Sequence, residues 1–180
     1  LSVMQKRIWF MEELNPGRPN YNTPSAHRLR GPLNEAAFQQ AFDAMVRRQP
    51  TLRTRIATEE GKPWQVVMDD VAIPLFPAED LSALDTTKRE AELASRLQRI
   101  TDQPFDLSAG PLVRARMFRL DLEEHVLFFM PHHLIWDGWS FDLMYSELAE
   151  LYNAHCGGFR ARLPALPVSY GDFAEWQTRW

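Results

Sequence analysis

The 180-residue sequence contains a single cysteine, Cys156, and no apolar run longer than Val126–Met130. A lone cysteine excludes an internal disulfide and a thiolate metal cage, and it suits a reducing, cytoplasmic location. The short apolar run excludes a bilayer-spanning helix, which needs about 20 residues. Basic residues are not in excess either, because 20 Lys and Arg face 24 Asp and Glu, for a net charge of −4. We therefore expect neither a membrane nor a nucleic acid as a partner.

Core-forming residues, by contrast, are abundant. Hydrophobic residues make up 45% of the chain, and its 11 Phe and 6 Trp can offset the entropy lost on folding. The length suits one domain or two small ones, and no internal repeat is visible. Because the sequence opens on Leu1 and ends on Trp180 within a helical pattern, we expect a part of a longer protein.

The apolar pattern alternates between helical and extended spacing along the chain. Helices are predicted at Ser2–Leu14, Asn34–Arg48, Asp85–Thr101, Phe141–Gly157 and Ser169–Trp180. Strands are predicted at Ala26–Arg30, Leu52–Thr58, Trp64–Met68, Val71–Phe76, Leu112–Leu120 and His125–Met130. The last strand is almost wholly apolar, which indicates a central position in a sheet. Helices and strands mixed without a repeat predict an α/β or α+β fold.

The most unusual segment follows the last predicted strand and reads His132-His133-Leu-Ile-Trp-Asp137-Gly138. An imidazole exchanges protons near neutral pH, and a nearby carboxylate can orient it. Structural roles are equally open, because histidines at strand ends often only form hydrogen bonds and Asp-Gly is a common turn. His133 and Asp137 supply only two metal ligands, so no metal site is expected. A serine hydrolase is disfavoured because the Gly-x-Ser-x-Gly motif is absent.

Four segments together resemble, in order, motifs of condensation domains from nonribosomal peptide synthetases. They are LSVMQKRIWF at residues 1–10, RQPTLRT at 48–54, MPHHLIWDGWS at 130–140 and YGDFAEW at 170–176. The third resembles the family's His-His-x-x-x-Asp-Gly signature. The resemblance spans the whole chain, although each motif alone is weak.

The resemblance implies an α/β (α+β) fold of the chloramphenicol-acetyltransferase type, in which two lobes enclose a tunnel. Residues 1–180 would form the N-terminal lobe, a two-layer sandwich of a mixed sheet with flanking helices, and the C-terminal lobe would be absent from this chain. Such domains form an amide bond between a donor thioester and the amine of an acceptor aminoacyl thioester. Phosphopantetheine arms of upstream and downstream carrier proteins deliver both substrates. The chain lacks the Gly-Gly-x-Ser signature of a carrier, so it is expected to bind no cofactor itself.

The resemblance also assigns roles within the signature. His133 would orient the attacking amine and accept its proton. His132 would be a packing and hydrogen-bonding residue, and cyclisation is disfavoured because related cyclisation domains carry Asp there. Gly138 would allow substrate or backbone to pass close to the reacting atoms. Asp137 would hold the loop through an ion pair with an arginine.

For that arginine, Arg53 is the first candidate and Arg48 the second. The aromatic residues of the other motifs are expected in the core; they are Trp9, Phe10, Phe173 and Trp176. Trp136 stands where many members of the family carry a small residue, which predicts either a reshaped tunnel wall or simple packing.

Two alternatives to amide formation stay open. One is epimerisation or another acyl transfer of the same superfamily, which the opening motif and Leu-Arg-Thr disfavour. The other is a docking platform for carrier proteins without catalysis, which the intact His133, Asp137 and Gly138 disfavour. The isolated lobe is expected to be inactive, because half of the tunnel wall would be missing.

Overall fold

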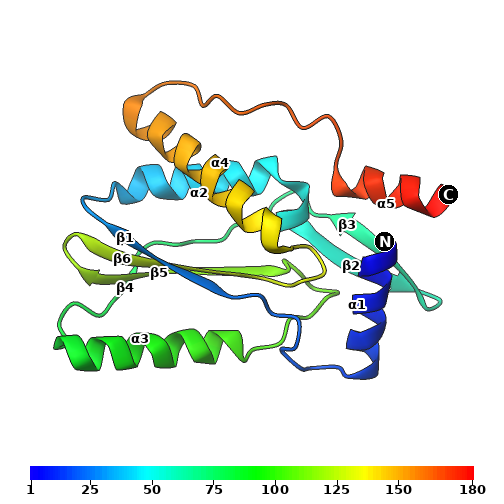
Figure 1. Cartoon of the computed structure of the whole chain (residues 1–180), viewed down its shortest axis with the longest axis horizontal. Helices are drawn as coiled ribbons and strands as arrows, with labels where there is room; N and C mark the ends of the chain where they lie inside the picture. The colour runs from blue at the N-terminus through cyan, green and yellow to red at the C-terminus, as the bar shows by residue number, and fades with distance from the viewer.

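The computed structural model describes all residues, 1–180, as one four-stranded sheet with helices on both faces and a separate hairpin (Figure 1). The helices are α1 (Val3–Leu14), α2 (Glu35–Arg48), the 3-10 turn η1 (Pro50–Arg53), α3 (Thr86–Thr101), α4 (Gly138–Gly157) and α5 (Tyr170–Arg179). The strands are β1 (Ser25–Arg30), β2 (Thr54–Glu59), β3 (Lys62–Val67), β4 (Glu79–Asp80), β5 (Val113–Asp121) and β6 (Glu124–Pro131).

The sheet has the order β1-β6-β5-β4 and is mixed, because β4 pairs with β5 in parallel and the other pairs are antiparallel. Helices α2 and α4 cover one face and α3 covers the other (Figure 1). The α/β class and the mixed sheet with flanking helices are confirmed. The layers number three rather than the expected two, because α3 closes the second face over its own hydrophobic cluster.

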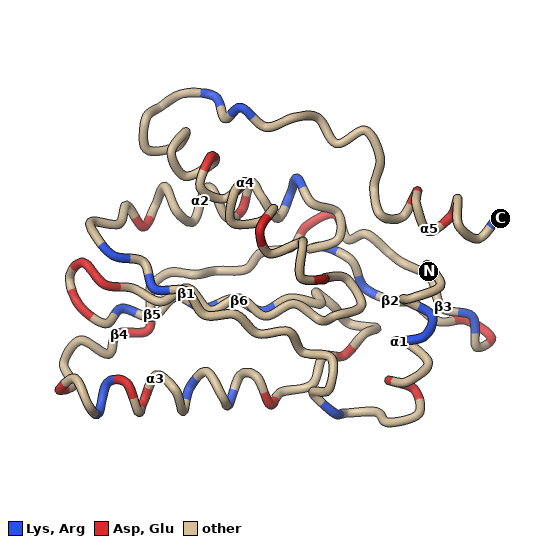
Figure 2. Tube along the Cα trace, viewed as in Figure 1, with Lys and Arg blue, Asp and Glu red and all other residues tan.

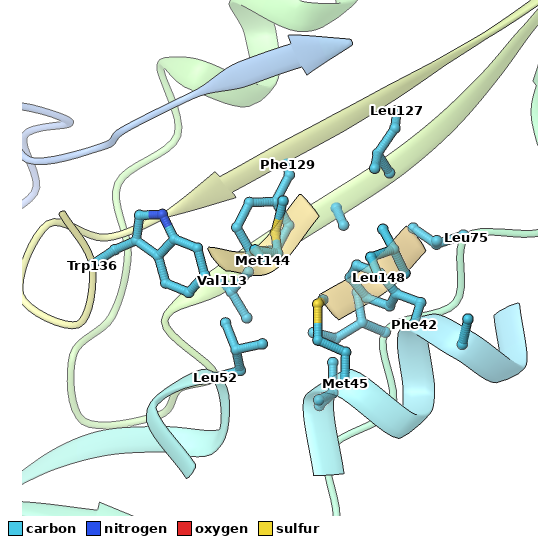
Figure 3. Packing of buried hydrophobic residues seen from close by; sticks show 14 of the residues in the cluster. Phe42, Met45, Leu52, Leu75, Val113, Leu127, Phe129, Trp136, Met144 and Leu148 are labelled. Atoms are coloured by element: carbon cyan, nitrogen blue, oxygen red, sulfur yellow. The ribbon is translucent and has the colours of Figure 1, made fainter. Parts of the chain in front are cut away.

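Strand β6 occupies the centre, as its apolar sequence predicts. Its side chains alternate between the two faces. Leu127 and Phe129 join the larger cluster of 21 buried residues under α2 and α4, whereas Val126 and Phe128 join the smaller cluster of seven under α3. The larger cluster also takes in Trp136, just beyond the end of β6 (Figure 3).

The helices begin where local chemistry predicts them. Asn34, Asp85 and Ser169 each accept a hydrogen bond from a backbone N–H of the first turn, and thereby cap α2, α3 and α5. Basic and acidic residues intermix along α3 (Figure 2), and half of its residues are exposed. None of the helices combines the length and the hydrophobicity needed to span a bilayer.

Several elements differ from the prediction. Val71–Phe76 forms no hydrogen-bonded strand, and the two-residue β4 was not predicted. Helix α4 starts at Gly138 rather than at Phe141, because Asp137 caps it. Pro50–Arg53 is a 3-10 turn that delays the start of β2 to Thr54.

The expected burial of the terminal helices is wrong for most of the aromatic residues. Phe10 is 56% exposed, Phe173 is 41% exposed and Trp176 is 56% exposed, and only Trp9 is partly buried against the core. The one buried residue of α1 is Gln5, a polar side chain. The inner face of α1 thus combines this polar side chain with Ile8 and Trp9, which pack against the core.

Candidate active site

The segment that joins β6 to α4, residues 132–137 and here called the signature loop, places its two histidines in opposite environments. Consecutive residues of an extended chain point to opposite sides. The backbone is held there by hydrogen bonds from His132 N to Leu112 O at 2.9 Å and from His133 N to Tyr21 O at 2.8 Å. As a result His132 is 2% exposed and enclosed, whereas His133 faces solvent.

His133 has one ring nitrogen engaged and one open. Its Nδ1 lies 2.6 Å from the carbonyl oxygen of Trp136. A carbonyl can only accept, so Nδ1–H is the donor and the neutral ring carries its lone pair on Nε2. No hydrogen bond engages Nε2. The loop therefore presents an imidazole of fixed tautomer whose free nitrogen can accept a proton.

His132 is locked inside the protein. Its Nδ1 accepts a hydrogen bond from Leu134 N at 3.1 Å, so its Nε2–H is the donor toward Glu12 Oε1 at 3.4 Å. Burial lowers the pKa of His132 to about 4, with a further contribution from neighbouring His133. Burial also raises the pKa of Glu12. His132 is therefore neutral near pH 7, and its contacts tie the loop to α1.

Asp137 caps α4 instead of forming an ion pair. Its Oδ1 accepts hydrogen bonds from the N–H of Ser140 at 2.9 Å and from the hydroxyl of Ser140 at 2.6 Å. The predicted pairing of Asp137 with Arg53 or Arg48 is wrong. A helix start offers unpaired N–H groups within reach of a preceding Asp, and Asp137 binds these local donors.

Both arginines are engaged elsewhere. Arg53 donates only to backbone carbonyls, among them Val46 O at 3.2 Å and Met68 O. Arg48 Nε donates to Glu147 Oε1 at 3.1 Å, across the α2–α4 contact. Both residues therefore hold the scaffold beneath the site and do not contact the loop carboxylate.

Gly138 is the first residue of α4 and is exposed. A Cβ added there would have no protein atom within 4 Å, and its φ is not in the left-handed region. The protein itself therefore does not need a glycine at this position, and no backbone passes close to it. The space beside it is open to a molecule from outside.

A cavity of about 370 Å³ opens beside His133, between the loop, α1, η1 and the start of α5. Its lining residues are Met4, Gln5, Ile8, Thr51, His133, Leu134, Ile135, Trp136, Asp137, Ser140 and Tyr170. The cavity thus combines an apolar wall with a few polar groups, which is the usual character of a small-molecule site. No group of three or more His, Cys, Asp or Glu side chains is placed to hold a metal.

The sequence did not reveal how α1 supports this site. Gln5 Oε1 accepts from Ser2 N at 2.9 Å, and Gln5 Nε2 donates to Leu134 O at 3.1 Å. The first bond belongs to a capping box, which the spacing Ser-x-x-Gln signals. The second bond fixes the middle of the signature loop, and no local sequence pattern predicts it. No sequence signal pointed to Glu12 either, because its partner His132 lies 120 residues away.

Comparisons with known proteins place this arrangement in a family. The family model described as "Condensation domain" matches residues 1–180. Phosphinothricin tripeptide synthetase PhsC of Streptomyces viridochromogenes is 40% identical over 179 residues, which cover 99% of this chain and 16% of that protein. Malpibaldin synthetase of Mortierella alpina is 36% identical over 181 residues, which cover 100% of this chain and 3% of that protein. The chain thus spans a small part of these relatives.

Solved structures agree on the fold. The first condensation domain of the calcium-dependent antibiotic synthetase, in complex with a substrate analogue, superposes with a TM-score of 0.87 and 26% identity. The match covers 99% of this chain and 42% of that one. The X-domain from teicoplanin biosynthesis gives a TM-score of 0.86 and 28% identity, over 99% of this chain and 37% of that one.

Proposed function

The chain belongs to the condensation domain family of nonribosomal peptide synthetases, and we propose that it is the N-terminal lobe of a domain that forms amide bonds. The donor is an acyl or aminoacyl thioester and the acceptor is the amine of an aminoacyl thioester. Phosphopantetheine arms of two carrier proteins would deliver the substrates. The coverage supports the proposal of one lobe, because nearly all of this chain matches 42% of a solved condensation domain chain.

The observation that carries the proposal is the open Nε2 of His133, a residue that lines the cavity, with Nδ1 held by Trp136 O at 2.6 Å. In the proposed step the acceptor amine attacks the donor carbonyl carbon, and a C–N bond forms. The proton on nitrogen passes to His133 Nε2. The C–S bond then breaks, and the same proton passes to the departing thiolate of the donor arm.

Little proton abstraction by His133 is needed before the acceptor amine attacks the donor carbonyl. An α-amino group has a pKa near 8, so part of it is already neutral at pH 7. The fixed ring therefore contributes mainly by orienting the amine and by taking up the proton as the intermediate forms. A ring held through its backbone contact supplies this orientation without the entropy cost of a free side chain.

An exposed aromatic row on α5 supports a second lobe as the partner of this face. Tyr170, Phe173, Trp176 and Trp180 follow one another with ring centroids 5.5, 5.9 and 6.3 Å apart. Phe173 and Trp176 are 41% and 56% exposed. Large apolar patches of this kind mark interaction surfaces. We propose that the C-terminal lobe covers the row and completes the tunnel.

The test uses the complete domain with its two loaded carriers and measures amide product by mass spectrometry. His133→Asn keeps an amide N–H near the position of Nδ1 but has no acceptor at the position of Nε2. We expect amide formation to fall about 100-fold or more, within the usual range for loss of a general acid–base group. Unchanged product formation in both His133→Asn and His133→Ala would exclude the catalytic role.

A docking role without catalysis is the second candidate. It is favoured by the likeness to the X-domain from teicoplanin biosynthesis, which is 28% identical to this chain. A solved structure shows that X-domain in a complex with OxyB. Under this candidate the wild-type domain makes no amide from loaded carriers. The same assay on the wild-type domain therefore separates the two functions.

A further inference from the structure

Trp136 is one of the residues that line the cavity beside His133, and its indole packs into the core. The residue is 8% exposed, and its ring centroid lies 5.2 Å from that of Phe129 and 5.6 Å from that of Phe141. Figure 3 shows the indole at the end of the core cluster, beside Phe129. Its backbone carbonyl accepts the hydrogen bond from His133. Trp136 is thus held both at its ring and at its backbone.

Stability alone does not explain an indole at this position. The Nε1–H of Trp136 is shielded from solvent and has no hydrogen-bond partner in the protein. A buried donor without a partner costs about 1–3 kcal/mol. A phenylalanine would fill much of the same space without that cost. At this residue of the cavity lining, the indole therefore supplies bulk at the expense of an unpaired donor.

Trp136 lies next to the position of a bound acceptor amine, because its carbonyl holds the ring of His133. An amine hydrogen-bonded to His133 Nε2 sits about 3 Å from that nitrogen. The Cα of the acceptor amino acid is bonded to this amine, and its side chain starts one bond further on. Leu134 and Ile135 line the same cavity as Trp136, so the surroundings suit an apolar side chain.

We propose that Trp136 determines acceptor specificity by limiting the size of the apolar side chain that the site admits. This inference rests on the proposed amide-forming function and adds its substrate class: acceptor amino acids with apolar side chains up to the bulk that the indole permits. In hydrophobic pockets a single methylene changes kcat/KM by about 10- to 200-fold. Removal of the indole therefore changes the selectivity by about tenfold or more.

The experiment uses the complete protein with one carrier-bound donor and a series of carrier-bound acceptors: alanine, leucine and phenylalanine. The kcat/KM of amide formation is measured for each acceptor in the wild-type protein, Trp136→Phe and Trp136→Ala. Trp64→Ala is the matched control. It also removes an indole, but that side chain is 40% exposed on β3, outside the cavity lining.

We expect the ratio of kcat/KM for phenylalanine over alanine to rise about tenfold or more in Trp136→Ala. The rise should be smaller in Trp136→Phe and absent in Trp64→Ala. Should Trp136→Ala not fold, Trp136→Phe decides, because it keeps the aromatic packing. An unchanged ratio in the folded Trp136 variants, with amide still formed, overturns the specificity role alone. No amide from the wild-type protein with any acceptor overturns the proposed function instead.

Discussion

The buried histidine of the signature should make the stability of the domain depend on pH. Burial lowers the pKa of His132 from 6.5 to about 4. Between these values the unfolded chain binds a proton at His132 and the folded chain does not, so stability is complete above pH 6.5 and declines as the pH falls toward 4. This lowering of the pKa, at about 1.4 kcal/mol for each pH unit, amounts to about 3–4 kcal/mol.

Two other buried groups affect the same pH range. Burial also lowers the pKa of His125, which adds a contribution of the same sign. Burial raises the pKa of Glu12, the partner of His132, and this contribution is opposite, since it favours the folded state as the pH falls. A comparison of variants is therefore needed to isolate His132.

The comparison is urea unfolding of the domain between pH 4.5 and 7.5, followed by tryptophan fluorescence. His132→Asn retains an acceptor for Leu134 N without a titrating ring. We expect the free energy of unfolding of the wild-type domain to rise with pH more steeply than that of His132→Asn. His155→Asn controls for the loss of any histidine, because its side chain lies in solvent. Equal pH dependence of the wild-type domain and His132→Asn would refute the reasoning.

Three substitutions test the contacts that hold the site. Asp137→Ala removes the cap of α4 and should lower the free energy of unfolding by about 1 kcal/mol, whereas Asp137→Ser should keep most of that stability. Equal melting temperatures for the wild type and both variants would contradict the capping role. Gln5→Leu leaves the buried carbonyl of Leu134 without its donor, so it should cost about 1–3 kcal/mol in denaturant unfolding and reduce amide formation. Stability and activity equal to wild type would show that this bond is dispensable. Glu147→Ala leaves Arg48 without its partner in a largely buried pair and should cost about 3–5 kcal/mol; a loss below 1 kcal/mol, the usual range of surface pairs, would mean that solvent compensates the charge.

Local chemistry made much of the fold predictable from the sequence. Asn34 and Asp85 are caps whose effect acts within three residues, so the starts of α2 and α3 could be read directly from the chain. The alternation along β5 could also be read, with Val113 and Met117 on one face and Phe118 on the other. Strand β4 could not, because its two residues are extended only through their pairing with Phe118 and Arg119.

The errors at the site arose where a local partner competes with a distant one. The resemblance suggested an arginine for Asp137, but the N–H groups at the start of α4 lie within three residues, and no reorganisation is needed to reach them. In α1 two of the apolar residues, Met4 and Met11, are exposed, whereas the polar Gln5 is buried. Apolar periodicity does not signal the burial of Gln5, because that side chain is held by a hydrogen bond to the backbone carbonyl of Leu134.

Helix α1 therefore acts as a support for the signature loop, and its geometry explains how. Gln5 and Glu12 are seven residues apart, which places them on one face about 10 Å apart along the helix axis. Gln5 holds the carbonyl of Leu134, and Glu12 holds the ring of His132. A loop held at two points cannot move or rotate along the helix without breaking one of the bonds. His133 lies between the two anchored residues, so the direction of its Nε2 depends on contacts that the histidine itself does not make.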